Sequence, residues 1–158
     1  DRALQGGDVL MLDTGAVVQG YFCDFDRNWS IGPASDPVRE ANRVLFDATE
    51  AAFDMARPGI RACDLHAAMA TILNRHGIAP VRGRLGHGLG MRLTEPPSLI
   101  PADLTELSPG MVLTLEPSLF LAPGRMIVYE EDIVITQTGA EWLTPRAPRE
   151  ITELEWQA

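Results

Sequence analysis

Residues 7–27 read GDVLMLDTGAVVQGYFCDFDR, and this stretch predicts the first structural unit of the chain. Its two apolar runs, residues 9–12 and 21–23, favour β-strands, and Gln19 and Gly20 between them indicate a tight turn. We therefore expect an antiparallel hairpin at the start of the chain.

A second hairpin is expected near the other end, where residues 111–115 on one side, and the apolar runs 127–128 and 133–135 on the other, flank Pro123 and Gly124. Between the hairpins, apolar side chains recur at steps of three and four from 38 to 55 and from 65 to 76, which predicts two helices. The residues that would begin the first helix are Ser35, Asp36 and Pro37, and those that would close the second are Gly77 and Pro80.

Each predicted hairpin carries a pair of acidic residues. Asp13 and Asp24 lie at equal distances from a turn centred between residues 18 and 19, and Glu116 and Glu131 lie at equal distances from a turn centred between residues 123 and 124. Directly opposed side chains point to the same face of a hairpin, where like charges repel. Four converging carboxylates therefore require cations, and two divalent ions would balance their charge. His87, flanked by glycines, would add an imidazole ligand.

Neighbouring acidic residues offer alternatives to this set. Asp26 lies two residues beyond Asp24, points to the same face of the strand and competes with it as a ligand. Glu130 and Asp132 are expected to point away from the face of Glu131, unless a β-bulge shifts the register.

Composition limits the classes of protein and partner. The length of 158 residues fits one domain, and 13 basic against 22 acidic residues give a net charge of −9, which argues against a nucleic-acid partner. No apolar run approaches the roughly 18 residues of a membrane span. The two cysteines, Cys23 and Cys63, fit a reducing compartment, so a cytoplasmic location is expected. Because Asp1 lies close to the first strand, we expect residues 1–158 to be the C-terminal portion of a longer protein.

Four blocks of the sequence together resemble a known family. They are residues 7–15 with Gly20-Tyr21, Asp24 and Arg27, Gly86-His87-Gly88-Leu89-Gly90 with Glu95-Pro96-Pro97, residues 109–117, and Glu131-Asp132. In this order they are similar to the pita-bread metallopeptidase family, which includes methionine aminopeptidase, aminopeptidase P and prolidase.

The resemblance implies an α+β pita-bread fold, with a curved antiparallel sheet, helices on one face, and the first N-terminal helices lacking. Residues 1–158 would form its catalytic domain. The metal ligands implied are Asp13, Asp24, His87, Glu116 and Glu131. They would hold two divalent ions, and oxygen ligands with one imidazole do not choose among manganese, cobalt, iron and zinc. A metal-bridging hydroxide would attack the substrate, with Glu116 and His87 as catalytic residues and Glu116 accepting a proton.

The activity implied is hydrolysis of C–N bonds, as in an Xaa-Pro aminopeptidase or dipeptidase acting on peptides. Thr94 and Tyr129 stand where family peptidases carry a histidine and an arginine, and would line the substrate pocket. The block around Thr94 also looks like the ectoine hydrolase branch, which acts on a small non-peptide substrate. A catalytically silent binding or dimerisation domain is the third alternative. The resemblance also implies a homodimer.

Overall fold

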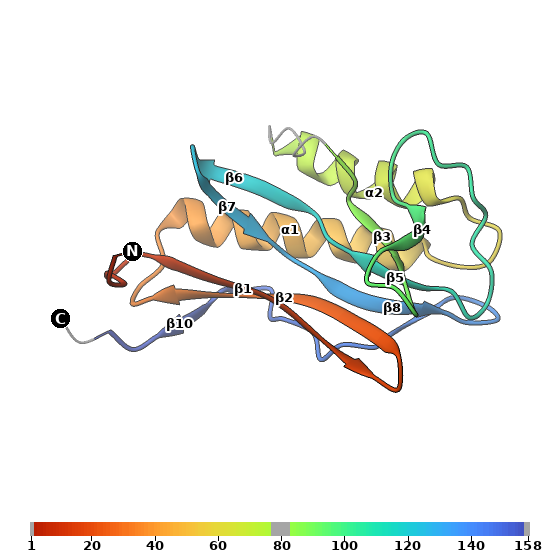
Figure 1. Ribbon diagram of the computed structural model, residues 1–158. Coiled ribbons are helices and arrows are strands. Elements are labelled where there is room, and N and C mark those ends of the chain that lie inside the picture. The colour runs from red at the N-terminus through yellow and green to blue at the C-terminus, as the bar shows by residue number, and fades with distance from the viewer. Residues whose placement is uncertain (1, 77–82, 157–158) are drawn as a thin grey trace.

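The computed structural model describes residues 2–76 and 83–156, and Figure 1 shows how their helices and strands are arranged. The elements are β1 (Val9–Val18), β2 (Tyr21–Ile31), α1 (Asp36–Met55), α2 (Ala62–Arg75), β3 (Gly86–Leu89), β4 (Glu95–Ser98), β5 (Val112–Leu115), β6 (Ser118–Ala122), β7 (Arg125–Val128), β8 (Glu131–Ile135), β9 (Ala140–Trp142) and β10 (Thr152–Leu154).

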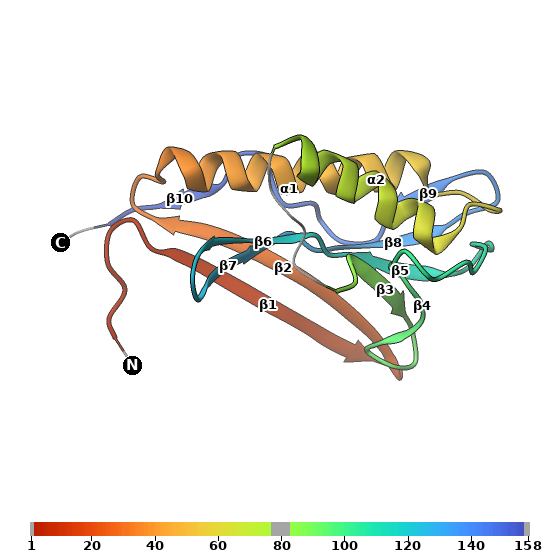
Figure 2. The ribbon, with the colours of Figure 1, turned by 90° about the horizontal axis from the view of Figure 1, so that it is seen from above.

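The strands form three sheets on one side of the helices. The sheet orders are β1-β2-β10, β4-β3-β5-β8-β9 and β6-β7, and every pair is antiparallel except β10 with β2. In Figure 2 both helices lie along the same face of the strands. The structure therefore confirms the predicted α+β class with helices on one face.

Both predicted helices are present, and they cover the apolar core. α1 begins directly after Ser35 with Pro37 in its first turn, where the lacking N–H of proline costs no helical hydrogen bond. Its buried stripe includes Leu45, and α2 contributes Leu65 and Met69. Gly77 and Pro80, expected to close the second helix, lie outside the described residues. Within the part of the chain that the structure describes, no helix is long and apolar enough to cross a membrane.

The first hairpin has the predicted strands with a different register. Its turn is formed by Gln19 and Gly20, which both have positive φ angles, of 52° and 88°. The centre of the hairpin therefore lies one residue later than expected, and Asp13 is opposite Asp26 instead of Asp24. The expected direct pairing is wrong. Because the shift amounts to two residues of register, Asp13 and Asp24 still share a face as diagonal neighbours.

The second hairpin contains a β-bulge close to its tip. Next to the turn, Ala122 lies opposite Arg125, which is the predicted register. One step further from the tip, Phe120 lies opposite Met126, so Leu121 is the extra residue. Such an insertion moves every later pairing by one position.

This shift exchanges the faces of the acidic residues in the second hairpin. Leu115 lies opposite Glu131, and Ser118 lies opposite Val128, so the register on both sides places Glu116 opposite Glu130. A slip of one residue turns each side chain to the other face of the sheet. The expected pairing of Glu116 with Glu131 is therefore wrong.

The glycine-rich segment forms a strand that sequence patterns do not reveal. β3 lies between β4 and β5, and all four of its residues are buried. A Cβ atom on Gly86 would lie 2.2 Å from the carbonyl oxygen of Thr114, and one on Gly88 would lie 2.3 Å from that of Pro96. Glycine is therefore required here because neighbouring backbones approach closely, and this close packing positions His87.

Candidate metal centre

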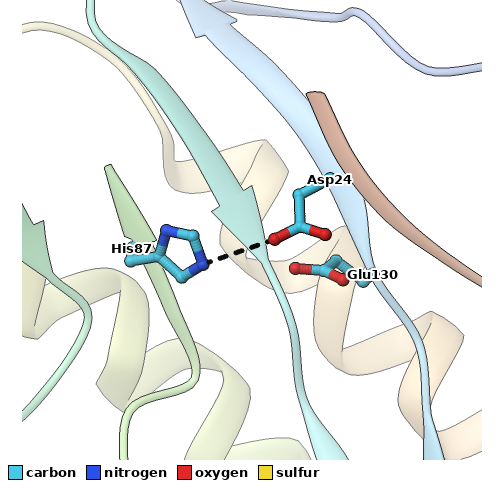
Figure 3. Close-up of side chains that lie close together, drawn as sticks. All are labelled: Asp24, His87 and Glu130. Atoms are coloured by element: carbon cyan, nitrogen blue, oxygen red, sulfur yellow. Dashed lines mark ion pairs between the residues drawn. The ribbon is translucent and has the colours of Figure 1, made fainter. Parts of the chain in front are cut away.

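Three side chains from separate parts of the chain meet at one point. One ligand atom each from Asp24 on β2, His87 on β3 and Glu130 just before β8 lie within 4.8 Å of one another. Figure 3 shows the two carboxylates and the imidazole directed towards a common centre. A carboxylate pair with one imidazole is a donor set that suits several divalent transition metals.

The imidazole of His87 is held in one orientation. Its Nδ1 lies 2.8 Å from the carbonyl oxygen of Gly88, and the ring is 1% exposed. Since a carbonyl oxygen only accepts, Nδ1 carries a proton, and in the neutral ring Nε2 therefore keeps the lone pair that a metal would take. Nε2 faces Asp24 Oδ2 at 3.9 Å, as the dashed line in Figure 3 marks, so it is directed into the centre as a metal ligand would be.

The two carboxylates are in an environment that disfavours their negative charge. Burial raises the pKa of Asp24, and the charge of Asp13 raises it further. Burial also raises the pKa of Glu130, together with the charges of Asp24 and Glu116. Oε1 of Glu130 is buried and has no hydrogen-bond partner. A buried, unpartnered acceptor beside other carboxylates fits a bound cation, which would satisfy the oxygen and offset the repulsion.

Two more predicted ligands lie at the edge of this group. Asp13 lines a pocket together with Asp24, and its charge acts on that residue. The charge of Glu116 acts on both Asp24 and Glu130, while its Oε1 accepts a hydrogen bond of 2.9 Å from Arg84. The structure therefore brings four carboxylates and one histidine into the same region.

Glu131 does not belong to this group, contrary to the sequence-based prediction. Its side chain is fully buried on the opposite face, where Oε2 accepts hydrogen bonds from Arg27 at 3.1 Å and from the Thr144 hydroxyl. Oε1 accepts a hydrogen bond of 2.7 Å from the backbone N–H of Ala147. Both oxygens of Glu131 thus accept hydrogen bonds from protein donors. The bulge at Leu121 places Glu130, instead of Glu131, on the face that carries Asp24 and His87.

A pattern in the sequence does indicate which face is which. The residues at 113, 115, 127, 133 and 135 are leucine or isoleucine, and all are buried in the core. With a period of two, odd positions therefore face the helices and even positions face away from them. Glu116 and Glu130 are even, whereas Glu131 is odd.

Tyr129 also stands at an odd position, and it lies in the core instead of the predicted substrate pocket. Its side chain is 1% exposed, its ring meets that of Phe46 on α1 edge-on at 5.8 Å, and its hydroxyl donates a 2.5 Å hydrogen bond to the carbonyl of Ala147. Tyr129 is a core residue, so that assignment is wrong. Thr94 is exposed and follows Leu93, which does line the pocket beside Asp24.

Asp26 was the competing ligand candidate in the first hairpin. It lies on the same face as Asp24 and is 1% exposed, and both of its oxygens are buried without a hydrogen-bond partner. Burial and the charge of Asp13 raise its pKa to about 7. Within the described residues it is not part of the compact group of Asp24, His87 and Glu130.

A pocket of about 310 Å³ opens beside the acidic group. Its polar wall includes Asp13 and Asp24, and its apolar wall includes Val17, Phe22 and Leu93. This volume is at the lower end of those found for small-molecule sites, so the pocket suits a compact ligand held next to the two carboxylates.

Known proteins resemble this chain in sequence and in structure. Residues 1–137 match the family described as Metallopeptidase family M24. The uncharacterized peptidase YqhT of Bacillus subtilis is 34% identical over 152 residues, which are 96% of this chain and 43% of that protein. The Xaa-Pro dipeptidase of Pyrococcus horikoshii is 31% identical over 145 residues, which are 91% of this chain and 41% of that protein.

A solved structure agrees closely with the fold. The crystal structure of dipeptidase PepE from Mycobacterium ulcerans superposes with a TM-score of 0.92 at 34% identity, covering 99% of this chain and 42% of that one. The chain therefore spans about two fifths of the length of the relatives that it matches.

Proposed function

The chain belongs to metallopeptidase family M24, and from that premise we propose that it carries the metal centre of a dinuclear hydrolase that cleaves C–N bonds in peptides, next to proline. The observation that carries the proposal is the convergence of Asp24, His87 and Glu130 within 4.8 Å. The similarity to an Xaa-Pro dipeptidase supports the choice of peptides as substrates.

Five side chains would hold two divalent ions, and they are Asp13, Asp24, His87, Glu116 and Glu130. The close group of three would form the centre of the site, with Asp13 and Glu116 on its two sides. Bound divalent ions supply Lewis acidity for the scissile carbonyl and lower the pKa of water. Manganese, cobalt, iron and zinc all accept this donor set.

In this proposal, side chains of the protein also bind the substrate and exchange a proton with it. Glu116 retains 21% exposure of its side chain, whereas Glu130 is 2% exposed, so Glu116 is the carboxylate best placed to exchange a proton with a substrate. The apolar wall formed by Phe22 and Leu93 would bind the uncharged part of the substrate and exclude water from it.

The proposal is tested by the metal content and substrate range of the intact protein. We expect copurifying or tightly bound divalent metal, and metal-dependent cleavage of a Gly-Pro dipeptide or of a longer peptide with proline in second position. Asp24→Ala should lose metal and activity together. Activity on ectoine alone would contradict the peptidase assignment, and a protein that binds metal without cleaving any of these substrates would support a silent binding domain instead.

A further inference from the structure

Arg27 connects the two segments that carry the central carboxylates of the candidate site. Its Nη1 donates a 2.6 Å hydrogen bond to the carbonyl oxygen of Asp26 and a 3.2 Å hydrogen bond to that of Glu130. Its Nη2 donates to Glu131 Oε2 at 3.1 Å and to the carbonyl oxygen of Pro145. One guanidinium thus bonds to β2, to the residues at the start of β8, and to the C-terminal segment.

These bonds lie where the sheets have no regular connection. Within the described residues β2 pairs only with β1 and β10, and β8 pairs only with β5 and β9. Two further hydrogen bonds cross the gap, from Asp26 N–H to the carbonyl of Glu130 at 3.3 Å and from Asp24 N–H to Asp132 Oδ2 at 3.1 Å. A third, from the Asn28 side chain to the carbonyl of Val128, joins β2 to the end of β7 just before Glu130. The distance between Asp24 and Glu130 therefore depends on these few links, and Arg27 makes the largest number of them.

The surroundings of Arg27 fix its geometry. Its side chain is 16% exposed and its guanidinium lies 4.8 Å from the centre of the Phe25 ring, while its partner Glu131 is fully buried and accepts two further hydrogen bonds. The planar fork of arginine carries donors on three separate nitrogens in a fixed geometry, whereas lysine presents all of its donors from a single nitrogen. A rigid group in this place suits the positioning of neighbouring ligands.

We propose that Arg27 is a positioning residue that sets the spacing between Asp24 and Glu130 and thereby preorganises the site for divalent metal. This inference rests on the proposed function. Arg27 would touch neither metal nor substrate, and it would act through the backbone of Asp26 and Glu130. Removing a group that orients metal ligands typically lowers metal affinity by about 10- to 100-fold.

The role in positioning can be separated from a role in stability alone. Arg27→Met by itself leaves the carboxylate of Glu131 buried without its charge partner, which destabilises the fold for a reason unrelated to metal. The double variant Arg27→Met with Glu131→Leu removes both charges, so it should recover part of the thermal stability, while Ala147 N–H and the Thr144 hydroxyl lose their acceptor. It does not restore the links between β2 and β8. We therefore expect its melting temperature to return towards that of the parent protein, while its affinity for Mn²⁺ remains about 10- to 100-fold lower.

The experiment is titration calorimetry of the metal-free, intact protein with Mn²⁺ alone, with a melting curve for each variant. Arg149→Met is the matched control, because Arg149 also forms a long-range carboxylate pair, with Asp47 on α1, away from the candidate site. It should bind Mn²⁺ like the parent. Parent-like affinity in the double variant would overturn the proposal. Should the double variant not fold, Arg27→Lys decides, because it keeps the charge and should still bind Mn²⁺ more weakly than the parent.

A second measurement keeps this inference distinct from the proposed function. If the parent protein binds no divalent metal, the proposed function fails, and hydrogen exchange of the metal-free protein still tests the link itself. The amides of Asp24 and Asp26 should exchange faster in the double variant than in the parent and in Arg149→Met. Equal exchange in all three would show that Arg27 does not hold β2 to β8.

Discussion

Glu130 and Glu131 are adjacent in sequence and have opposite environments. The carboxylate of Glu130 has an unpartnered buried oxygen facing Asp24 and His87, whereas both oxygens of Glu131 accept hydrogen bonds in the core. A substitution that removes the charge and retains the shape should therefore have different effects at the two positions.

We expect Glu130→Gln to lower the affinity for Mn²⁺ by at least about 100-fold with little loss of stability, because a charged ligand is replaced in a site that repels negative charge. Glu131→Gln should instead lower the free energy of unfolding by about 1–3 kcal/mol. The amide of glutamine has one oxygen, which can accept from Ala147 N–H or from Arg27 and Thr144, but not from both sides. Its metal affinity should fall less than about tenfold. Titration calorimetry and urea unfolding of both variants measure the contrast, and the reverse result would restore Glu131 as the ligand.

Tyr129 provides a second comparison between the core and the site. Tyr129→Phe removes the hydroxyl that donates to the carbonyl of Ala147 and keeps the ring against Phe46. We expect a loss of about 0.5–1.5 kcal/mol in unfolding free energy. The KM and kcat for a proline-containing dipeptide should be unchanged, and a large rise in KM would show instead that Tyr129 contacts the substrate.

Single residues of the site could be predicted from the sequence only where no long-range register was needed. His87 was identified by its flanking glycines and Asp24 as one of the acidic pair in the first hairpin, and both are found in the central group, although the expected pairing of Asp24 with Asp13 is wrong. Glu130 was missed because one extra residue, Leu121, exchanges the two faces of the second hairpin, so that Glu130 and not Glu131 faces the candidate site. The alternating apolar residues indicate correctly that odd positions face the core and even positions face the site. Counting residues from the turn assigns the faces wrongly, because it ignores the bulge.

At the scale of elements, the helices were easier to predict than the strands. The spacing of apolar residues in α1 and α2 is a local property, and Ser35 and Pro37 indicate where α1 begins. β3 was missed because its glycines have low strand propensity. It forms because only glycine at positions 86 and 88 leaves room for the backbones of β5 and β4 beside it. That requirement depends on partners distant in the sequence.

The packing of α1 on the sheets should dominate the stability of the fold. Leu45 is completely buried in the core, and Leu45→Ala is expected to lower the unfolding free energy by about 2–5 kcal/mol through lost burial and the cavity that remains. The same substitution at Leu104, which is 62% exposed, should change it by less than about 0.5 kcal/mol. Denaturant unfolding of the two variants checks this, and equal losses would argue against the helix-covered core.

At the scale of the whole molecule, metal and folding should be coupled. The candidate site gathers carboxylates from β2 and from both strands of the second hairpin, so their repulsion opposes the native arrangement until cations bind. At a free Mn²⁺ concentration of about 100 times the Kd, binding adds about 2.7 kcal/mol to the stability. A chelator should therefore lower the melting temperature of the parent protein, and readdition of Mn²⁺ should restore it. Asp24→Ala should show neither change.

The bulge at Leu121 also determines where the chain tolerates changes in length. Deleting Leu121 would give a regular ladder from the turn onwards and leave Glu116 opposite Glu130. Deleting one residue between the bulge and Glu116, or between the turn and Glu130, would instead turn that glutamate to the core-facing side of the sheet. Homologous chains can therefore vary in length at this tip, but an alignment gap placed a few positions away would transfer the ligand role to the wrong acidic residue.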